Sequence, residues 1–109
     1  MNRRSGLVWV LAMLLVAGCV SFRFGHPFPS PDPGSIRAGT TDRTSLQRLF
    51  GDPYQVGLDS GDRTWRWFYG ERRAASEVTK DFTVRFNPDG TVKAYSFTSN
   101  FPEDMKRLK

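Results

Sequence analysis

The first pattern along the chain is an uninterrupted apolar run near its N-terminus. Residues 7–18 read LVWVLAMLLVAG, carry no charge and follow Arg3 and Arg4. Such a run is too short to cross a membrane as a helix, which takes about 20 residues. Its length and the basic residues before it are typical of a secretory signal. The sequence therefore predicts an export signal over residues 1–18.

A second pattern has the period of an amphipathic helix. The apolar residues spaced i, i+3 and i+4 are Leu46, Leu49 and Phe50, and this spacing places them on one stripe. Thr41 can cap the N-terminus of the helix, with Asp42 in the first turn facing the helix dipole. Gly51 suits the position after the last turn, and Pro53 prevents the helix from continuing. We expect a helix from about residue 42 to residue 50.

Alternating apolar and polar residues predict three strands. Their ranges are 64–69, 82–86 and 91–98. The second and third are joined by Asn87-Pro88-Asp89-Gly90, a turn in which proline presets φ and glycine permits positive φ, so they form a hairpin. In the first strand, one face carries Trp65, Trp67 and Tyr69, and the opposite face carries Arg66 and Phe68.

The remaining segments are less regular. In the third strand the alternation changes phase between residues 92–94 and 95–97, and a β-bulge would reconcile the two parts. Residues 54–58 alternate as well, and they extend the first strand or pair briefly with it. Residues 70–79 (GERRAASEVT) are expected to form a polar excursion between strands, and residues 101–109 to fray after one helical turn at most.

These elements predict an α+β fold. One or two short helices pack on a three-stranded antiparallel β-meander, behind a signal peptide and a Pro-rich linker. Such a sheet has one covered face and one face that can remain free.

The only cysteine directly follows small residues at the end of the apolar run. Leu15-Val16-Ala17-Gly18-Cys19 resembles a bacterial lipobox. The resemblance implies cleavage before Cys19 and two or three acyl chains on it, palmitate among them, and two chains are enough for stable anchoring. Ordinary signal cleavage near Gly18, with an incidental Cys19, is the alternative.

Residues 19–34 are predicted to form a tether. Proline occupies positions 27, 29, 31 and 33, where it removes backbone donors and forces the preceding residues to be extended. We expect a semi-rigid spacer that holds a domain of residues 35–109 away from a membrane, with His26 as a solvated linker residue. The aromatic residues Phe22, Phe24 and Phe28 either enter the membrane interface or a partner groove, or pack loosely on the domain.

Composition narrows the chemistry further. One Cys and one His are too few for a disulfide or a structural zinc site, so we expect no metal and no cofactor. From Cys19 onward the chain has 14 basic and 11 acidic residues, a net charge of +3. This weak excess, together with export, excludes nucleic acid as a partner.

The sequence does not favour an enzyme. A Ser-His-acid triad needs a histidine in the domain, and the only histidine lies in the predicted tether. The carboxylates Asp59, Asp62, Glu71 and Glu77 lie in polar, turn-like stretches, and we expect them to be solvated.

The order of the motifs resembles the SmpA/OmlA (BamE-like) family of outer-membrane lipoproteins. The residues that carry this resemblance are Ile36, Gly39, Thr41, Leu46, Leu49, Gly51, Pro53, Trp67, Phe68, Tyr69, Phe86, Gly90 and Val92. The resemblance covers about residues 35–98 and the lipobox. It implies a helix-plus-three-strand fold, no enzymatic activity, and partners in the envelope, the machine that assembles β-barrel proteins among them. Val20-Ser21 after Cys19 resembles an outer-membrane address, which implies a lipid-anchored protein with its domain in the periplasm.

Two functions remain open from the sequence. The first is a non-catalytic module that docks on outer-membrane assembly or scaffold proteins, with an exposed Arg66 and Phe68 as the docking candidates. The second is a binding or inhibitory domain for a periplasmic enzyme or glycan. In both, most of the aromatic residues are expected to form the core.

Overall fold

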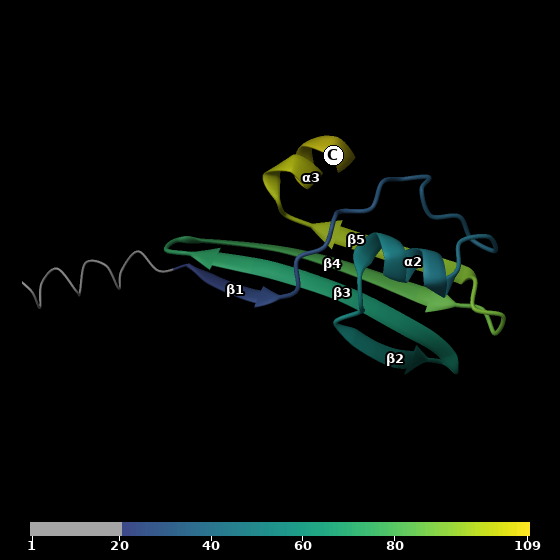
Figure 1. Cartoon of the computed structure of the whole chain (residues 1–109). Helices are drawn as coiled ribbons and strands as arrows, with labels where there is room; N and C mark the ends of the chain where they lie inside the picture. The colour runs from purple at the N-terminus through teal and green to yellow at the C-terminus, as the bar shows by residue number, and fades with distance from the viewer. Residues whose placement is uncertain (1–20) are drawn as a thin grey trace, which may run out of the picture.

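The computed structural model describes residues 21–109. The elements in chain order are β1 (Phe22–Gly25), α2 (Arg43–Phe50), β2 (Gln55–Asp59), β3 (Asp62–Arg73), β4 (Ser76–Phe86), β5 (Val92–Ser99) and α3 (Pro102–Leu108) (Figure 1). The predicted export signal and Cys19 lie outside the described residues. The α+β class is confirmed, with five strands instead of the three predicted.

The sheet is antiparallel throughout, with the strand order β1-β3-β4-β5 and with β2 also paired to β3. β1 and β2 lie end to end along the same edge of β3. Phe22 is opposite Arg72, whereas Gln55 is opposite Arg66. Between the two strands, the N–H of His26 donates to the Phe68 carbonyl at 3.0 Å. One edge of the longest strand is therefore closed along most of its length.

The predicted tether is wrong for the part of residues 19–34 that the structure describes. Residues 22–25 form β1, and Phe28, Pro31 and Ile36 are buried. The four prolines begin only after β1, so the FRFG segment keeps the backbone donors that a strand needs. Burial of Phe28 against the core then holds the following segment on the domain.

The predicted polar excursion over residues 70–79 is also wrong. β3 continues to Arg73 and β4 begins at Ser76, so the two strands form one long hairpin that turns at residues 74–75. The apolar alternation stops there because this part of the hairpin is held by backbone pairing with little apolar burial. At Gly70 any Cβ would overlap the Phe24 ring, so glycine lets β1 lie close to β3.

The helix predicted over residues 42–50 is confirmed as α2, with two corrections at the level of single residues. Asp42 is the N-cap, with its carboxylate accepting from the N–H of Ser45 at 2.9 Å, so the predicted cap at Thr41 is wrong. Leu46 is completely buried, whereas Leu49 is 53% exposed. The apolar stripe is narrower than the spacing indicated, because a helix of only two turns contacts the sheet with a single line of residues.

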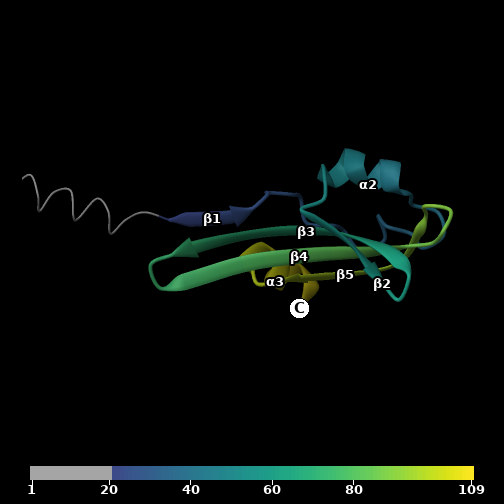
Figure 2. The ribbon, with the colours of Figure 1, turned by 90° about the horizontal axis from the view of Figure 1, so that it is seen from below.

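The core lies between α2, the segment that leads to it, and one face of the sheet (Figure 2). Its residues are Phe28, Ile36, Leu46, Phe50, Trp67, Tyr69, Phe82, Val84, Phe86 and Val92. Phe82 is at the centre, with the ring centroids of Phe50 and Trp67 5.0 and 5.2 Å away. The indole N–H of Trp67 donates to the carbonyl of Gly51 at 3.1 Å, which satisfies a buried donor and fixes the end of α2 on the sheet.

The expected bulge is confirmed in β5. Arg85 is opposite Ala94 but Phe86 is opposite Val92, so Lys93 is the extra residue. Val92 and Phe97 thereby turn their side chains to the same face, and Val92 is fully buried.

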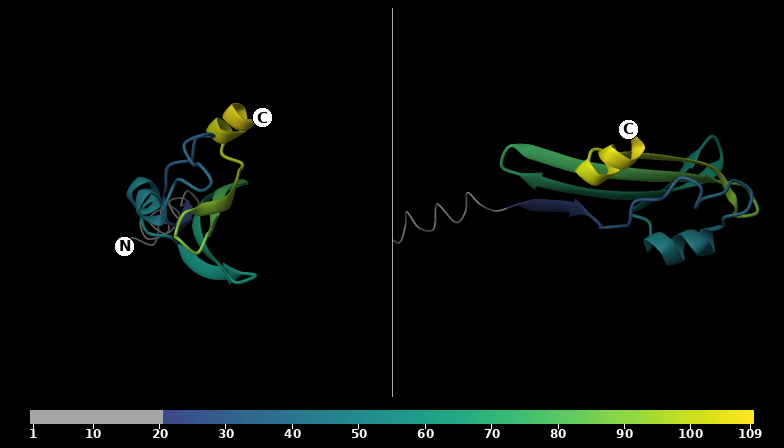
Figure 3. Two further views of the ribbon diagram at one scale, coloured as in Figure 1. Left: turned by 90° about the vertical axis from the view of Figure 1, so that its right-hand side faces the viewer. Right: turned by 90° about the horizontal axis from the view of Figure 1, so that it is seen from above.

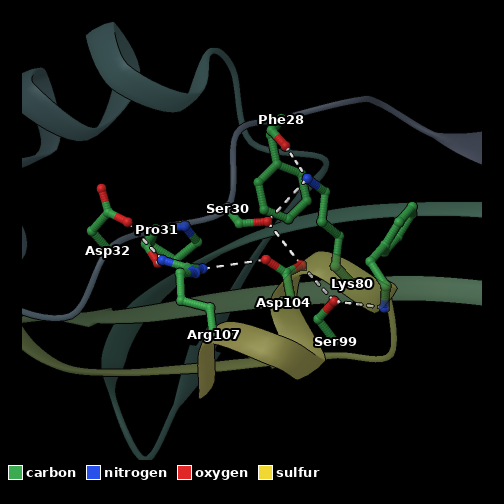
Figure 4. Close-up of polar contacts among 9 residues, drawn as sticks. Phe28, Ser30, Pro31, Asp32, Lys80, Ser99, Asp104 and Arg107 are labelled. Carbon is green, nitrogen blue, oxygen red and sulfur yellow. Dashed lines mark hydrogen bonds and ion pairs between the residues drawn. The ribbon is translucent and has the colours of Figure 1, made fainter. Parts of the chain in front are cut away.

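The C-terminus forms α3 rather than fraying. Asp104, which is 6% exposed, accepts hydrogen bonds from Ser30 at 2.9 Å, Ser99 at 2.6 Å and Arg107 at 3.2 Å (Figure 4). Burial alone would raise the pKa of Asp104, but these three donors outweigh burial and lower it. α3 is therefore fastened both to β5 and to the segment after β1.

Lys80 adds a second connection in the same region. Its ammonium donates to the carbonyl of Phe28 and lies 4.8 Å from the centroid of the Phe28 ring. Burial lowers the pKa of Lys80, and the charge of Asp104 works in the opposite direction. This lysine holds the Pro-rich segment down on β4.

Candidate functional site

The face of the sheet opposite α2 carries the two docking candidates. An end-on view shows α2 on one side of the curved sheet (Figure 3, left). Because side chains alternate along a strand, Arg66 and Phe68 point away from the buried Trp67 and Tyr69. The opposite orientation predicted for these two pairs is confirmed, and both docking candidates are half-buried.

Phe68 is the centre of an aromatic cluster on this face. The Phe24 ring from β1 lies 6.2 Å away in a stacked arrangement, and the Tyr54 ring lies 6.0 Å away. His26 contacts Tyr54 edge-on at 5.9 Å. The two flanking segments thus cover part of Phe68, and the accessible surface is a mixed aromatic cluster rather than one exposed ring.

Arg66 joins this cluster to the polar centre of the face. Its guanidinium lies 4.9 Å from the centroid of the Phe68 ring and forms a bidentate ion pair with Asp81, with a shortest distance of 2.6 Å. A further N–H donates to Gln55 at 2.7 Å. The hydrogen bonds with Asp81 raise the pKa of Arg66. Arg66 is therefore held in one orientation by its own strand and by two neighbouring strands, β2 and β4.

A second group of charges lies nearer the β2–β3 turn. Asp62 accepts from Lys93 at 2.8 Å and from Arg85 at 2.9 Å, and Arg85 also pairs with Asp59 at 3.4 Å. The hydrogen bond from Lys93, with help from Arg85, lowers the pKa of Asp62 against the effect of burial. Asp62 is therefore an ionised acceptor in ion pairs, which does not suit a general acid.

The residues quoted for the family resemblance are mainly structural. Those that are buried are Ile36, Leu46, Trp67, Tyr69, Phe86 and Val92, and those with positive φ are Gly39, Gly51 and Gly90. The hydroxyl of Thr41 accepts from the N–H of Arg37 at 2.9 Å, and Pro53 is half-buried. Leu49 alone among the apolar members is exposed.

One surface was missed by sequence reasoning. The tip of the β3–β4 hairpin and the start of β1 lie side by side at one end of the sheet (Figure 1). We call this surface the hairpin end and define it as Phe22, Arg23, Arg72 and Arg73. Phe22 is 64% exposed, and the three arginines are exposed as well. The signal was present in the FRF and GERR segments, but only the pairing of β1 with β3 brings them together.

Within residues 21–109, the structure holds no group of three or more His, Cys, Asp or Glu side chains suited to a metal ion. Helices in that part of the chain are all too short or too polar to span a bilayer. Comparison of the chain with protein-family models, curated proteins and solved structures gave no significant match.

Proposed function

We propose that this protein is a lipid-anchored, non-catalytic lipoprotein of the outer membrane. In this proposal Cys19 carries the acyl chains, and the domain in the periplasm is an accessory or scaffold module of SmpA/OmlA (BamE-like) type. It serves outer-membrane protein assembly or envelope maintenance. The lipobox and the order of sequence motifs support the anchor and the family.

The observation that carries the docking role is the arrangement around Arg66. Its guanidinium is fixed by Asp81 and Gln55 and lies over Phe68. Arginine and aromatic side chains are frequent among the residues that dominate protein interfaces, and side chains that are ordered before binding lose little entropy on binding. The proposed docking face is therefore the face opposite α2, centred on Arg66 and Phe68.

The anchor is tested by mass spectrometry of the mature N-terminus. We expect a chain that begins at Cys19 and carries acyl mass, and we expect Cys19→Ser to remain unprocessed or leave the membrane. A mature chain that begins elsewhere without acyl mass contradicts the anchor.

The docking face is tested by photo-crosslinking in intact cells. A crosslinking residue at Thr83, which neighbours Arg66 on this face, is compared with one at Leu49, which is exposed on α2. We expect an envelope protein to be captured from position 83 and not from position 49, with capture lost in Phe68→Ala. Equal capture from both positions contradicts the assignment of the face. Capture of a periplasmic hydrolase would instead favour the inhibitory alternative.

A further inference from the structure

The hairpin end lies close to the predicted anchor because the chain between Cys19 and β1 is short. β1 starts at Phe22, three positions after Cys19. Because an extended chain spans at most about 3.6 Å per residue, the Cα atoms of Cys19 and Phe22 are within about 11 Å of each other in any conformation. If Cys19 is acylated, as the proposed function requires, β1 cannot be held far from the bilayer.

β1 is fixed to the rest of the domain, so its position sets the orientation of the whole sheet. Its four residues pair with positions 69–72 of β3, and the Phe24 ring packs against Gly70 and Phe68. The chain enters β1 at the end that faces the β3–β4 turn, because Phe22 is opposite Arg72. The anchor therefore draws the hairpin end, and not the β2–β3 turn, toward the membrane.

The chemistry of the hairpin end suits a lipid headgroup layer. An exposed aromatic ring is stable at the level of the headgroups, and long arginine side chains can reach lipid phosphates while their stems stay on apolar surface. Three arginines lie here with two carboxylates, Glu71 and Glu77. Glu71 is already engaged by the hydroxyl of Tyr69 at 2.7 Å and by Arg73 at 3.0 Å. Its hydrogen bond with Tyr69 is the main cause that lowers the pKa of Glu71.

We propose that the hairpin end rests on the headgroups of the membrane that holds Cys19, with Phe22 entering the interface and Arg23, Arg72 and Arg73 contacting lipid phosphates. The sheet then stands on the membrane by one end. β3 has 12 residues, so the β2–β3 turn is about 40 Å farther from the surface along the strands if the sheet stands upright. The face with Arg66 and Phe68 stays exposed to the periplasm.

A matched pair of tryptophan variants tests this orientation. Phe22→Trp places the probe at the hairpin end, and Leu58→Trp places it on β2 at a residue that is 74% exposed. Each full-length variant is purified after processing and reconstituted into vesicles of phosphatidylethanolamine and phosphatidylglycerol with brominated acyl chains. We expect at least twofold quenching of the added fluorescence for Phe22→Trp and none for Leu58→Trp. Trp65 and Trp67 contribute the same background to both.

The outcomes separate this inference from the proposed function. A protein that is acylated and sediments with the vesicles, but shows no quenching at position 22 or equal quenching at both positions, overturns the orientation alone. A protein without acyl chains overturns both. In the Phe22→Trp background, Arg72→Gln with Arg73→Gln is expected to halve the quenching, whereas Arg37→Gln with Arg48→Gln leaves it unchanged. Equal effects of the two pairs of substitutions would show that Arg72 and Arg73 do not contribute specifically to the membrane contact.

Discussion

The hydroxyl of Ser30 donates a 2.9 Å hydrogen bond to the carboxylate of Asp104, across 74 positions of the sequence. The same carboxylate oxygen accepts from Ser99 at 2.6 Å. One buried side chain thus joins the segment after β1, the end of β5 and the start of α3. The N-terminal and C-terminal parts of the domain depend on each other through it.

Asp104→Asn is expected to lower the free energy of unfolding by about 1–3 kcal/mol. The substitution keeps the shape of the side chain but removes charge-assisted hydrogen bonds in a buried place. Chemical denaturation of the full protein in detergent measures the loss. Glu103→Gln on the same helix is the control, because Glu103 is exposed, and it should stay within about 0.5 kcal/mol of the parent. Equal effects of the two variants would show that the Asp104 contacts do not stabilise the domain.

Acid should weaken the domain partly through the same residue. The pKa of Asp104 is lowered in the folded state, so its contribution to stability is complete above the pKa of the unfolded chain, near 3.8. That contribution is lost as the pH falls through the lower, folded-state pKa. Unfolding free energy measured between neutral pH and pH 2 should therefore fall less steeply for Asp104→Asn than for the parent. Parallel curves would contradict the assigned pKa shift.

Leu46→Ala and Leu49→Ala are the same change at two positions of α2, three residues apart. The first removes a side chain with no exposed surface and leaves a cavity, so it should cost about 2–5 kcal/mol. The second removes a side chain that is 53% exposed and should cost less than about 1 kcal/mol. Thermal or chemical denaturation gives both values. Similar losses would mean that Leu49 is buried against the sheet after all.

Gly25→Ala tests whether β1 belongs to the sheet. Gly25 has a φ of 77°, and a Cβ there would overlap the Phe68 carbonyl. We expect faster hydrogen exchange along residues 69–72. We also expect the free energy of unfolding to fall by more than about 1–3 kcal/mol, the cost of a positive φ alone for a residue other than glycine. Gly34→Ala is the control, because Gly34 has a φ of 92° with no neighbouring atom within 4 Å of an added Cβ. If residues 69–72 exchange equally in both variants, β1 is not docked as described.

Local signals were sufficient to predict much of this fold. The spacing of apolar residues, together with the start and stop signals at the two ends, predicted α2. The change in the apolar alternation around Lys93 predicted the bulge. The strand assignment failed at Phe22–Gly25 and at residues 70–79, where the strands are held by backbone pairing with distant segments. Side-chain periodicity does not report such pairing. The burial of Phe28 was not predicted because the prolines around it favour an extended linker. The Phe28 ring packs on Phe82, which is distant in sequence, with the two ring centroids 6.5 Å apart.

The candidate site was predictable only in part. Alternation placed Arg66 and Phe68 on the face opposite Trp67, as found. The partners of Arg66 were not predictable, because Asp81 and Gln55 come from two other strands whose register is set by the whole sheet. The hairpin end was hidden because Arg23 lies about 50 positions before Arg72 and Arg73 in the sequence.

The end-to-end placement of β1 and β2 also limits how these molecules can associate. Polymerisation through edge strands needs a long run of free backbone donors and acceptors, and one border of this sheet consists of two short strands, β1 and β2, with a gap between them. At the other border, Val92 is engaged by the loop at residues 39–41, and the irregular step at Lys93 sets a positive charge next to it. Among the described residues, the free edges are therefore two short strands and the part of β5 after Lys93, so growth from edge to edge between copies finds no long continuous template.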